Sequence, residues 1–177
     1  MKNEKLVSMV EAAMMAALSF VLNLFIVYKM PQGGTVTAGA MVPIIIVALR
    51  RGAPWGILAG AVSGLLQFIS TGEAIHPASI LLDYLLAYAV LGVSGWFSSS
   101  LPKVMFGTVF AVILRFVCHL LSGALIFASY APDGQNPWLY SMGYNASYML
   151  PELVITVAVT IALYLFAKPL FRKKTRK

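Results

Sequence analysis

The hydrophobic positions of this chain gather into six long runs, separated by shorter stretches rich in polar residues, glycine and proline. A transmembrane helix needs about 20 apolar residues to cross ~30 Å of hydrocarbon, and most of the runs approach or exceed this length. The pattern therefore predicts an all-α integral membrane protein, a single membrane domain (residues 1–177) with six transmembrane helices. We place the spans at residues 6–28, 36–49, 53–70, 78–97, 104–129 and 144–168, followed by a basic tail at 169–177.

The second and third runs stand out by their glycine and proline content. Residues 36–49 are few for a complete span, and Pro31, Gly39 and Pro43 lie at or near its entrance. This segment is a candidate for partial unwinding near the outer face, which membranes tolerate only where the backbone is buried in protein or lines a cavity. Small residues at every fourth position allow helices to approach closely. Close packing, rather than ligand binding, is thus the favoured role of three glycines in the third run: Gly56, Gly60 and Gly64.

The basic residues fall almost entirely on one side of the predicted membrane. Of the 13 Lys and Arg residues, Lys29 alone lies in a connection on the other side, and Arg115 lies inside a span. The positive-inside rule assigns the basic side to the cytoplasm. We therefore expect both termini to be cytoplasmic and the loops near 29–35, 71–77 and 130–143 to face outward. The basic residues on the cytoplasmic side are Lys2, Lys5, Arg50, Arg51, Lys103, Lys168, Arg172, Lys173, Lys174, Arg176 and Lys177.

Composition narrows the possible function classes. Hydrophobic residues make up 60% of the chain and charged residues 11%, so six helices leave no room for a soluble catalytic domain. The sequence contains no Walker A motif, so the chain is not expected to hydrolyse ATP by itself. Its net charge of +7 is explained by basic residues at helix ends, near anionic lipid heads, better than by a nucleic-acid partner. The single Cys118 excludes an intrachain disulfide, and no metal site is expected from one Cys and two distant His residues.

Polar residues inside the spans form stripes on three of the predicted helices. A charged side chain at the bilayer centre costs about 2.5–3.5 kcal/mol on insertion scales, so each one needs a partner or a cavity. The members of each stripe are spaced so that they share one helical face, and we expect the three faces to converge inside the bundle. The stripes comprise Ser79, Asp83 and Tyr84 in the fourth span, Arg115, His119, Ser122 and Gly123 in the fifth, and Ser141, Asn145, Tyr148 and Glu152 in the sixth.

The expected topology also gives the depth of these residues. At 1.5 Å per residue, Asp83 lies ~8 Å from the outer end of its span. His119 lies nearer the middle of the membrane, and Asn145 lies at the outer end of the last span. Together these residues predict a pocket that opens to the exterior. Arg115 and Glu152 lie deeper, and a structural ion pair between them is favoured over direct contact with a ligand.

Aromatic residues crowd the outer third of the fifth and sixth spans. Tyr140, Tyr144 and Tyr148 repeat at helical spacing beside Asn145. Aromatic faces and an unpaired carboxylate, here Asp83, suit a flat cationic heterocycle through stacking and cation–π attraction. Basic residues are scarce on the expected outer side of the membrane, which also favours a cationic ligand. An interfacial aromatic belt and a packing role for Asp83 are the alternatives. The aromatic set also includes Phe127, Tyr130 and Trp138.

One short sequence suggests an enzyme instead. Residues 92–95, Gly-Val-Ser-Gly, match the G-x-S-G sequence around the serine of rhomboid-type intramembrane proteases, and His119 could be the base. The expected topology opposes this reading, because Ser94 lies near the cytoplasmic end of its span whereas His119 lies nearer the middle of another. We therefore expect a protein without catalytic residues.

Several segments, taken in order, resemble the thiamine-specific S component of energy-coupling factor (ECF) transporters, the ThiT/YuaJ family. The resemblance covers nearly the whole chain. Each segment alone is a weak signal, but their order and spacing together are specific. The segments are EAAMMAAL at 11–18, PIIIVALRRG at 43–52, LDYL at 82–85, His119 with Gly123 and Tyr130, and YSMGYN at 140–145.

The resemblance implies a substrate-binding protein of the bacterial cell membrane, with the S-component (RibU-like) fold and with neither enzymatic activity nor a cofactor. Such a protein captures thiamine outside the cell and works with a transmembrane coupling protein and two cytoplasmic ATPases. Ala13 and Ala17 match the small-residue face that packs on the coupling protein, and Asp83 matches the carboxylate that holds the aminopyrimidine ring. The remaining matches in or beside the pocket are Tyr84, His119, Gly123, Phe127, Tyr140 and Asn145.

The chain departs from the family pattern in two places. Relatives carry a glutamate where this chain has the shorter Asp83. Some also carry a tryptophan and an acid where this chain has Gly33-Gly34 and Ala38, which leaves the role of the 29–37 loop as a lid open. An S component for a thiamine precursor or another vitamin is one alternative function. A membrane scaffold that binds no small ligand is the other.

Overall fold

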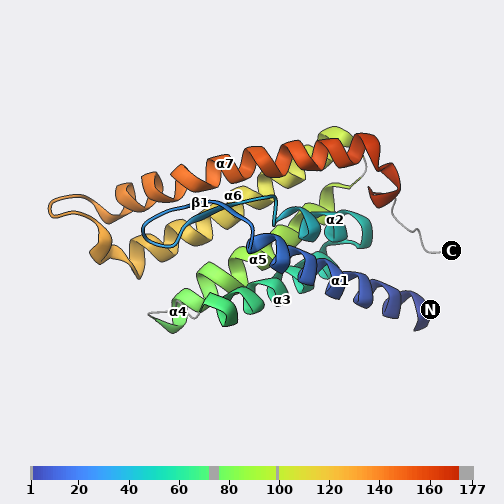
Figure 1. Cartoon of the computed structure of the whole chain (residues 1–177), viewed down its shortest axis with the longest axis horizontal. Coiled ribbons are helices and arrows are strands. Elements are labelled where there is room, and N and C mark those ends of the chain that lie inside the picture. The colour runs from blue at the N-terminus through green and yellow to red at the C-terminus, as the bar shows by residue number, and fades with distance from the viewer. Residues whose placement is uncertain (1, 72–75, 99, 172–177) are drawn as a thin grey trace.

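The computed structural model describes residues 2–71, 76–98 and 100–171, which form a bundle of helices with one small hairpin of strands (Figure 1). α1 begins and α7 ends at the same end of the bundle, the termini end; α4 and the connection between α6 and α7 lie at the other end. In order, the elements are α1 (Lys2–Asn23), β1 (Ile26–Lys29), β2 (Thr35–Thr37), α2 (Val42–Arg51), α3 (Ala53–Thr71), α4 (Pro77–Ser79), η1 (Ile80–Leu86), α5 (Ala87–Ala89), η2 (Val90–Phe97), α6 (Leu101–Leu125), η3 (Ala128–Tyr130), α7 (Pro137–Phe166) and η4 (Lys168–Phe171).

Five helical segments of the described chain are long and apolar enough to cross a membrane: Asn3–Asn23, Ala53–Thr71, Pro77–Phe97, Leu101–Leu125 and Pro137–Phe166. They overlap five of the six predicted spans. The sixth, predicted at 36–49, corresponds to α2, which has only 10 residues. At 1.5 Å per residue α2 is ~15 Å long, about half of the ~30 Å hydrocarbon thickness. α2 is thus a sixth helix of the bundle but not a complete span.

The position of α2 explains how so short a helix is accommodated. Every residue from Val42 to Leu49 is buried, and α2 packs against α1, α3 and η2. Pro43 stands in its first turn, where a missing N–H is tolerated. The residues before α2 form β2 and a turn. In this turn Gly39 has φ 88°, a conformation that favours glycine. The neighbouring helices therefore surround α2, and the expectation of an unwound entrance to this segment is confirmed.

The first predicted span, residues 6–28, extends beyond the end of its helix. Residues 24–28 are not helical, because α1 ends at Asn23 and the chain continues into β1. β1 pairs antiparallel with β2, with Ile26 opposite Thr37 and Lys29 opposite Thr35. The run Leu-Phe-Ile-Val-Tyr at 24–28 is apolar enough for a membrane helix, yet its β-branched and aromatic residues also favour a strand. The fold is therefore predominantly helical rather than wholly α.

The last two spans are shifted relative to their predicted bounds. α6 ends at Leu125 rather than at residue 129, and α7 begins at Pro137 rather than at 144. The early start of α7 has a local cause: the Asn136 side chain accepts a hydrogen bond from the Trp138 N–H at 2.8 Å, and Pro137 follows it as the first helical residue. Tyr140 consequently lies on the helix, in register with Tyr144 and Tyr148.

Close packing of the third span through its glycines is confirmed. α3 lies against η1, α5 and η2. A Cβ atom on Gly60 would lie 2.7 Å from the Tyr88 carbonyl carbon, and one on Gly56 would lie 2.8 Å from the Gly92 Cα atom. Larger side chains would separate the two backbones. This contact positions the segment from α4 to η2, which includes the π-helical turn η1 that carries Asp83. Such turns are frequent at functional sites.

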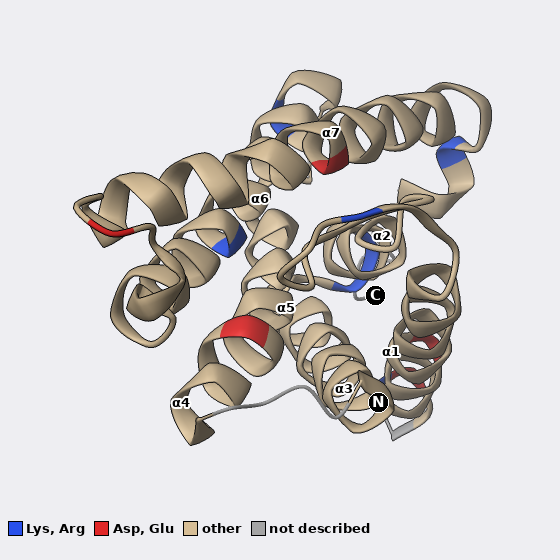
Figure 2. Cartoon of the chain, turned by 60° about the vertical axis from the view of Figure 1, so that its left-hand side comes forward, with Lys and Arg blue, Asp and Glu red and all other residues tan. Residues whose placement is uncertain are grey.

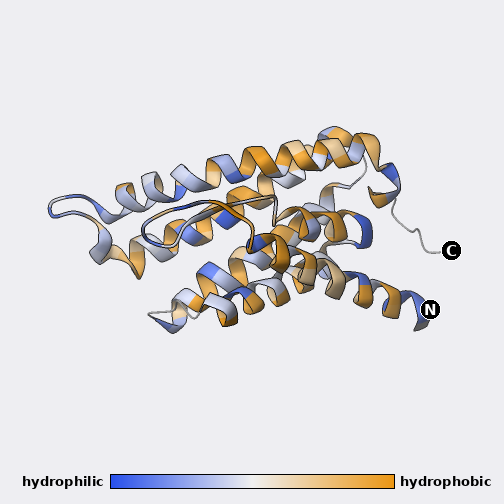
Figure 3. Cartoon of the chain, in the orientation of Figure 1, coloured by the Kyte–Doolittle hydropathy of each residue, from blue (hydrophilic) through white to orange (hydrophobic). Residues whose placement is uncertain are grey.

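Charged residues are sparse along the helices (Figure 2), and apolar residues predominate on the long helices (Figure 3). Glu11 on α1 pairs with Arg50 at 3.1 Å and with Arg51, both at the end of α2. Of the predicted basic tail, residues 169–171 belong to η4. Residues 172–177 lie outside the described residues.

Candidate functional site

A cavity of about 710 Å³ lies among α6, α7 and η1 on one side and α1, α3 and the hairpin on the other. Every residue that the sequence proposed for substrate binding lines it. These residues come from three helical segments and the turn after α6: Asp83 and Tyr84 from η1, His119 and Gly123 from α6, Phe127 from the turn, and Tyr140, Tyr144 and Asn145 from α7. The convergence of the three polar stripes is confirmed.

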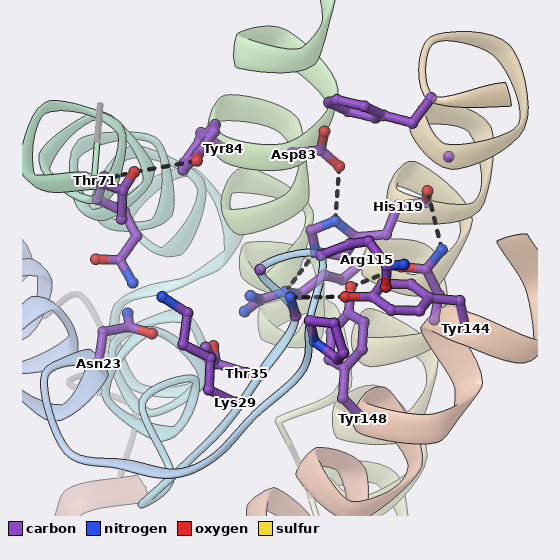
Figure 4. Close-up of a pocket in the computed structure, with 18 of the residues that line it drawn as sticks. Asn23, Lys29, Thr35, Thr71, Asp83, Tyr84, Arg115, His119, Tyr144 and Tyr148 are labelled. Atoms are coloured by element: carbon purple, nitrogen blue, oxygen red, sulfur yellow. Dashed lines mark hydrogen bonds and ion pairs between the residues drawn. The ribbon is translucent and has the colours of Figure 1, made fainter. Parts of the chain in front are cut away.

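Asp83 and His119 are joined across the cavity wall (Figure 4). His119 Nδ1 lies 2.9 Å from Asp83 Oδ1, and the Ser122 hydroxyl donates to Asp83 Oδ2. Arg115 Nε donates to His119 Nε2 at 3.3 Å. Because a guanidinium can only donate, Nε2 is the acceptor, so a neutral imidazole carries its proton on Nδ1 and donates it to Asp83. The carboxylate is therefore paired, which corrects the expectation of an unpaired Asp83.

Arg115 and Glu152 do not form the predicted ion pair. The guanidinium carbon of Arg115 lies 4.1 Å from the centre of the Tyr88 ring, a cation–π contact. Glu152 instead accepts hydrogen bonds from the backbone N–H and the hydroxyl of Thr37, at 2.5 and 2.6 Å. The charges of Arg115 and Glu152 act on one another only at longer range. The hairpin, which the sequence did not predict, brings Thr37 to the carboxylate, while Tyr88 takes the cation.

The α7 tyrosines form an aromatic ladder along the cavity. Tyr140 and Tyr144 are stacked with ring centres 6.2 Å apart, and Tyr148 meets Tyr144 edge-on at 5.9 Å. Their hydroxyl groups hold neighbouring chain segments. Tyr144 accepts from the Gly34 N–H at 3.1 Å, and Tyr140 accepts from the Gln32 side chain at 3.0 Å. The rings therefore line the cavity while two of the hydroxyls anchor the loop above it.

Asn145 and Gly123 set the distance between α6 and α7. The Asn145 amide donates to the His119 carbonyl of α6 at 3.4 Å, and the Ser141 hydroxyl donates to the Leu120 carbonyl of α6 at 2.9 Å. Within α7, Asn145 is held by the Ser141 carbonyl at 2.8 Å and by the Tyr148 hydroxyl at 2.7 Å. A Cβ atom at Gly123 would come within 3.1 Å of the Ser141 Cβ atom. Both residues line the cavity. Phe127, at the cavity rim, stacks on Tyr130 at 5.5 Å.

The sequence patterns predicted a pocket formed by spans four to six, so the opposite wall was not predicted. It consists of residues from α1, α3 and the hairpin loop. Tyr88 connects α1 and α3 in this wall, because its hydroxyl donates to Asn23 at 3.1 Å and accepts from Gln67 at 3.5 Å. Isolated amides in apolar spans were the available signal for Asn23 and Gln67. The loop positions had no such signal. The main additional lining residues are Asn23, Lys29, Gln32, Gly33, Gly34, Thr35, Gln67, Thr71 and Tyr88.

The remaining candidates lie outside the cavity. Ala13 and Ala17 are exposed on α1, whereas Ala12 and Ala16 of the same helix are buried in the bundle. The serine of the protease-like sequence, Ser94, is fully buried, and its hydroxyl donates to the Leu91 carbonyl at 2.8 Å. His119 makes its contacts with Asp83 and Arg115 instead, so no serine–histidine pair is formed.

Comparisons of the whole chain with known proteins identify its family. The family model described as Thiamine transporter protein (Thia_YuaJ) matches residues 9–172. The chain is similar to the thiamine transporter ThiT of Bacillus subtilis, with 37% identity over 97% of each chain. It is also similar to ThiT of Lacticaseibacillus paracasei, with 28% identity over 99% of this chain and 96% of the relative. A solved structure of ThiT from Listeria monocytogenes shares the fold, with a TM-score of 0.83 and 23% identity over 96% of this chain and 99% of the other. The chain therefore belongs to the thiamine transporter protein family and is a multi-pass protein of the bacterial plasma membrane, not an enzyme.

Proposed function

We propose that this chain is the thiamine-binding S component of an ECF-type importer. The observation that carries the proposal is the meeting of a carboxylate, an imidazole and a ladder of tyrosines in one cavity of about 710 Å³. That volume lies within the range of about 300–1,000 Å³ typical of small-molecule sites. The names of the relatives, thiamine transporters in both cases, support the same ligand.

The chemistry of thiamine suits the two kinds of groups in the cavity. Its aminopyrimidine ring offers N–H donors, and each oxygen of Asp83 keeps a free lone pair beside its present hydrogen bond. Its thiazolium ring is a flat cation, which aromatic faces such as those of Tyr140 and Tyr144 attract by about 0.5–2 kcal/mol each. The pairing of Asp83 with His119 orients the carboxylate before a ligand arrives. Pre-organisation of this kind lowers the cost of binding.

The energy for import must then come from other subunits. We propose that both termini are cytoplasmic, because Arg50, Arg51 and Lys103 lie at helix ends on the expected inner side. The exposed Ala13 and Ala17 would form the surface on which the transmembrane coupling protein docks, since small residues let a partner helix approach closely. Two cytoplasmic ATPases, implied by the family resemblance, would power release on the inner side.

Calorimetric titration of the purified chain in detergent tests the ligand assignment. Several contacts of about 1–3 kcal/mol each should give at least submicromolar affinity for thiamine. Asp83→Asn should weaken binding by about 2 kcal/mol, or roughly 30-fold, while the protein remains folded. Tighter binding of hydroxymethylpyrimidine or riboflavin than of thiamine would favour a different S component. A chain that binds none of these compounds would be the scaffold, and the proposal would fail.

A further inference from the structure

The two walls of the cavity differ in charge. On the wall formed by η1, α6 and α7, Asp83 is paired with His119, and Arg115 lies over the Tyr88 ring. On the opposite wall, Lys29 projects from the hairpin into the cavity on the side of Asn23 (Figure 4). Among the described lining residues, Asp83 is the only carboxylate, whereas Lys29 and Arg115 are both cationic. The described wall is therefore net positive.

Of these two cations, Lys29 has fewer contacts that offset its positive charge. Its ammonium makes no ion pair or side-chain hydrogen bond with the described residues, whereas Arg115 contacts both His119 and the Tyr88 ring. The backbone of Lys29 is fixed, because β1 pairs with β2 and places Lys29 opposite Thr35. The strand pairing thus keeps the exposed side chain of Lys29 beside the cavity, where no described residue neutralises its charge. For a protein that binds a permanent cation this arrangement is unfavourable.

We propose that Lys29 is a charge-selecting residue of the cavity: it weakens the binding of cationic ligands and strengthens the binding of the same scaffold when that scaffold carries an anionic group. The proposal rests on the proposed function, because it takes thiamine as the scaffold. Two unit charges ~8 Å apart change an equilibrium by about 2- to 30-fold as the effective dielectric constant falls from ~80 to ~20. The effect has opposite signs for a cation and for an anion, and it vanishes for a neutral ligand.

The test compares three ligands that share the thiamine scaffold and differ in charge. These are thiamine, its neutral analogue with a thiophene ring in place of the thiazolium, and thiamine monophosphate. Their affinities are measured by calorimetry for the wild-type chain and for Lys29→Gln, Lys29→Arg and Lys103→Gln. Lys103 is the matched control, because it is an exposed lysine in the first turn of α6, whereas the cavity-lining residues of α6 lie in its second half.

Lys29→Gln should bind thiamine about 3- to 10-fold more tightly, the neutral analogue equally well, and the monophosphate about 3- to 10-fold more weakly. These differences should shrink in high salt. Lys29→Arg and Lys103→Gln should resemble the wild type. An equal change for all three ligands, or no change for any of them, would overturn the charge-selecting role. A wild-type chain that binds neither thiamine nor its derivatives would instead refute the proposed function itself.

Discussion

Glu152 allows a direct test of how the hairpin is held over the cavity. Its side chain is 5% exposed, and one carboxylate oxygen accepts both hydrogen bonds from Thr37, the last residue of β2. Hydrogen bonds to charged groups contribute about 1.5–3 kcal/mol each. The second oxygen is buried and has no hydrogen-bond partner among the described residues, which offsets part of this gain. We therefore expect Glu152→Ala to remove about 2–3 kcal/mol of the free energy that keeps the hairpin closed.

Amide hydrogen exchange measures this free energy on the purified protein. A loss of about 2–3 kcal/mol raises the open population roughly 30- to 150-fold, so amides of residues 26–37 should exchange faster by that factor. The dissociation rate of thiamine should rise with it. Glu152→Gln keeps one acceptor oxygen and should have a smaller effect. Thr37→Val removes only the hydroxyl bond and should also have a smaller effect.

Glu11→Gln is the matched control. It removes another carboxylate of the bundle, one that pairs with Arg50 and Arg51 away from the hairpin, so exchange in the hairpin should stay unchanged. If Glu152→Ala instead accelerated exchange equally in α3 and α6, Glu152 would stabilise the bundle as a whole. That result, or an unchanged hairpin, would refute the reasoning.

Three further changes probe packing, binding and coupling. Gly60→Leu should lower the melting temperature strongly, because the new side chain would meet the Tyr88 backbone. Gly143→Leu is the control and should leave the melting temperature nearly unchanged, since no described atom lies within 4 Å of a Cβ atom built there. Equal melting curves for the two variants would contradict the packing argument. If the His119 imidazole lies beside the thiazolium half of the ligand, His119→Ala should weaken the binding of thiamine about 10-fold and that of an isolated pyrimidine less. Calorimetry with both ligands measures the difference, and equal losses would mean that His119 acts only by orienting Asp83. Ala17→Trp should abolish thiamine uptake by cells while the isolated chain still binds thiamine; loss of both would place Ala17 in the pocket or the core.

The parts of the fold that follow from local periodicity could be predicted from the sequence. His119 and Gly123 lie on one face of α6 simply because they are four residues apart, and their shared position in the cavity follows from that spacing. The glycines of α3 are predictable for the same reason. In each case the relevant interaction depends on which face of a helix a residue occupies, and hydrophobic patterning decides that face.

The parts that depend on distant pairing could not be predicted. Thr37 and Glu152 are 115 residues apart in the sequence, and nothing local to either residue indicates the other. The same is true of the strand pairing, because residues 24–28 are equally suited to a membrane helix until β2 is placed beside them. The ion pair expected between Arg115 and Glu152 failed for this reason: opposite charges on adjacent helices were matched without knowledge of the hairpin and of Tyr88.

The loop of the hairpin lies close against the tyrosine ladder of α7. Tyr140, Tyr144 and Glu152 all belong to α7, and each holds a different point of the segment from Gln32 to Thr37. A Cβ atom on Gly34 would come within 2.6 Å of the Tyr148 ring, so the loop approaches α7 as closely as it does because glycine occupies this position. Tyr140 and Tyr144 thus hold the loop and also form part of the cavity wall. A ligand that stacks on their rings would therefore contact side chains whose hydroxyl groups the loop already holds in place.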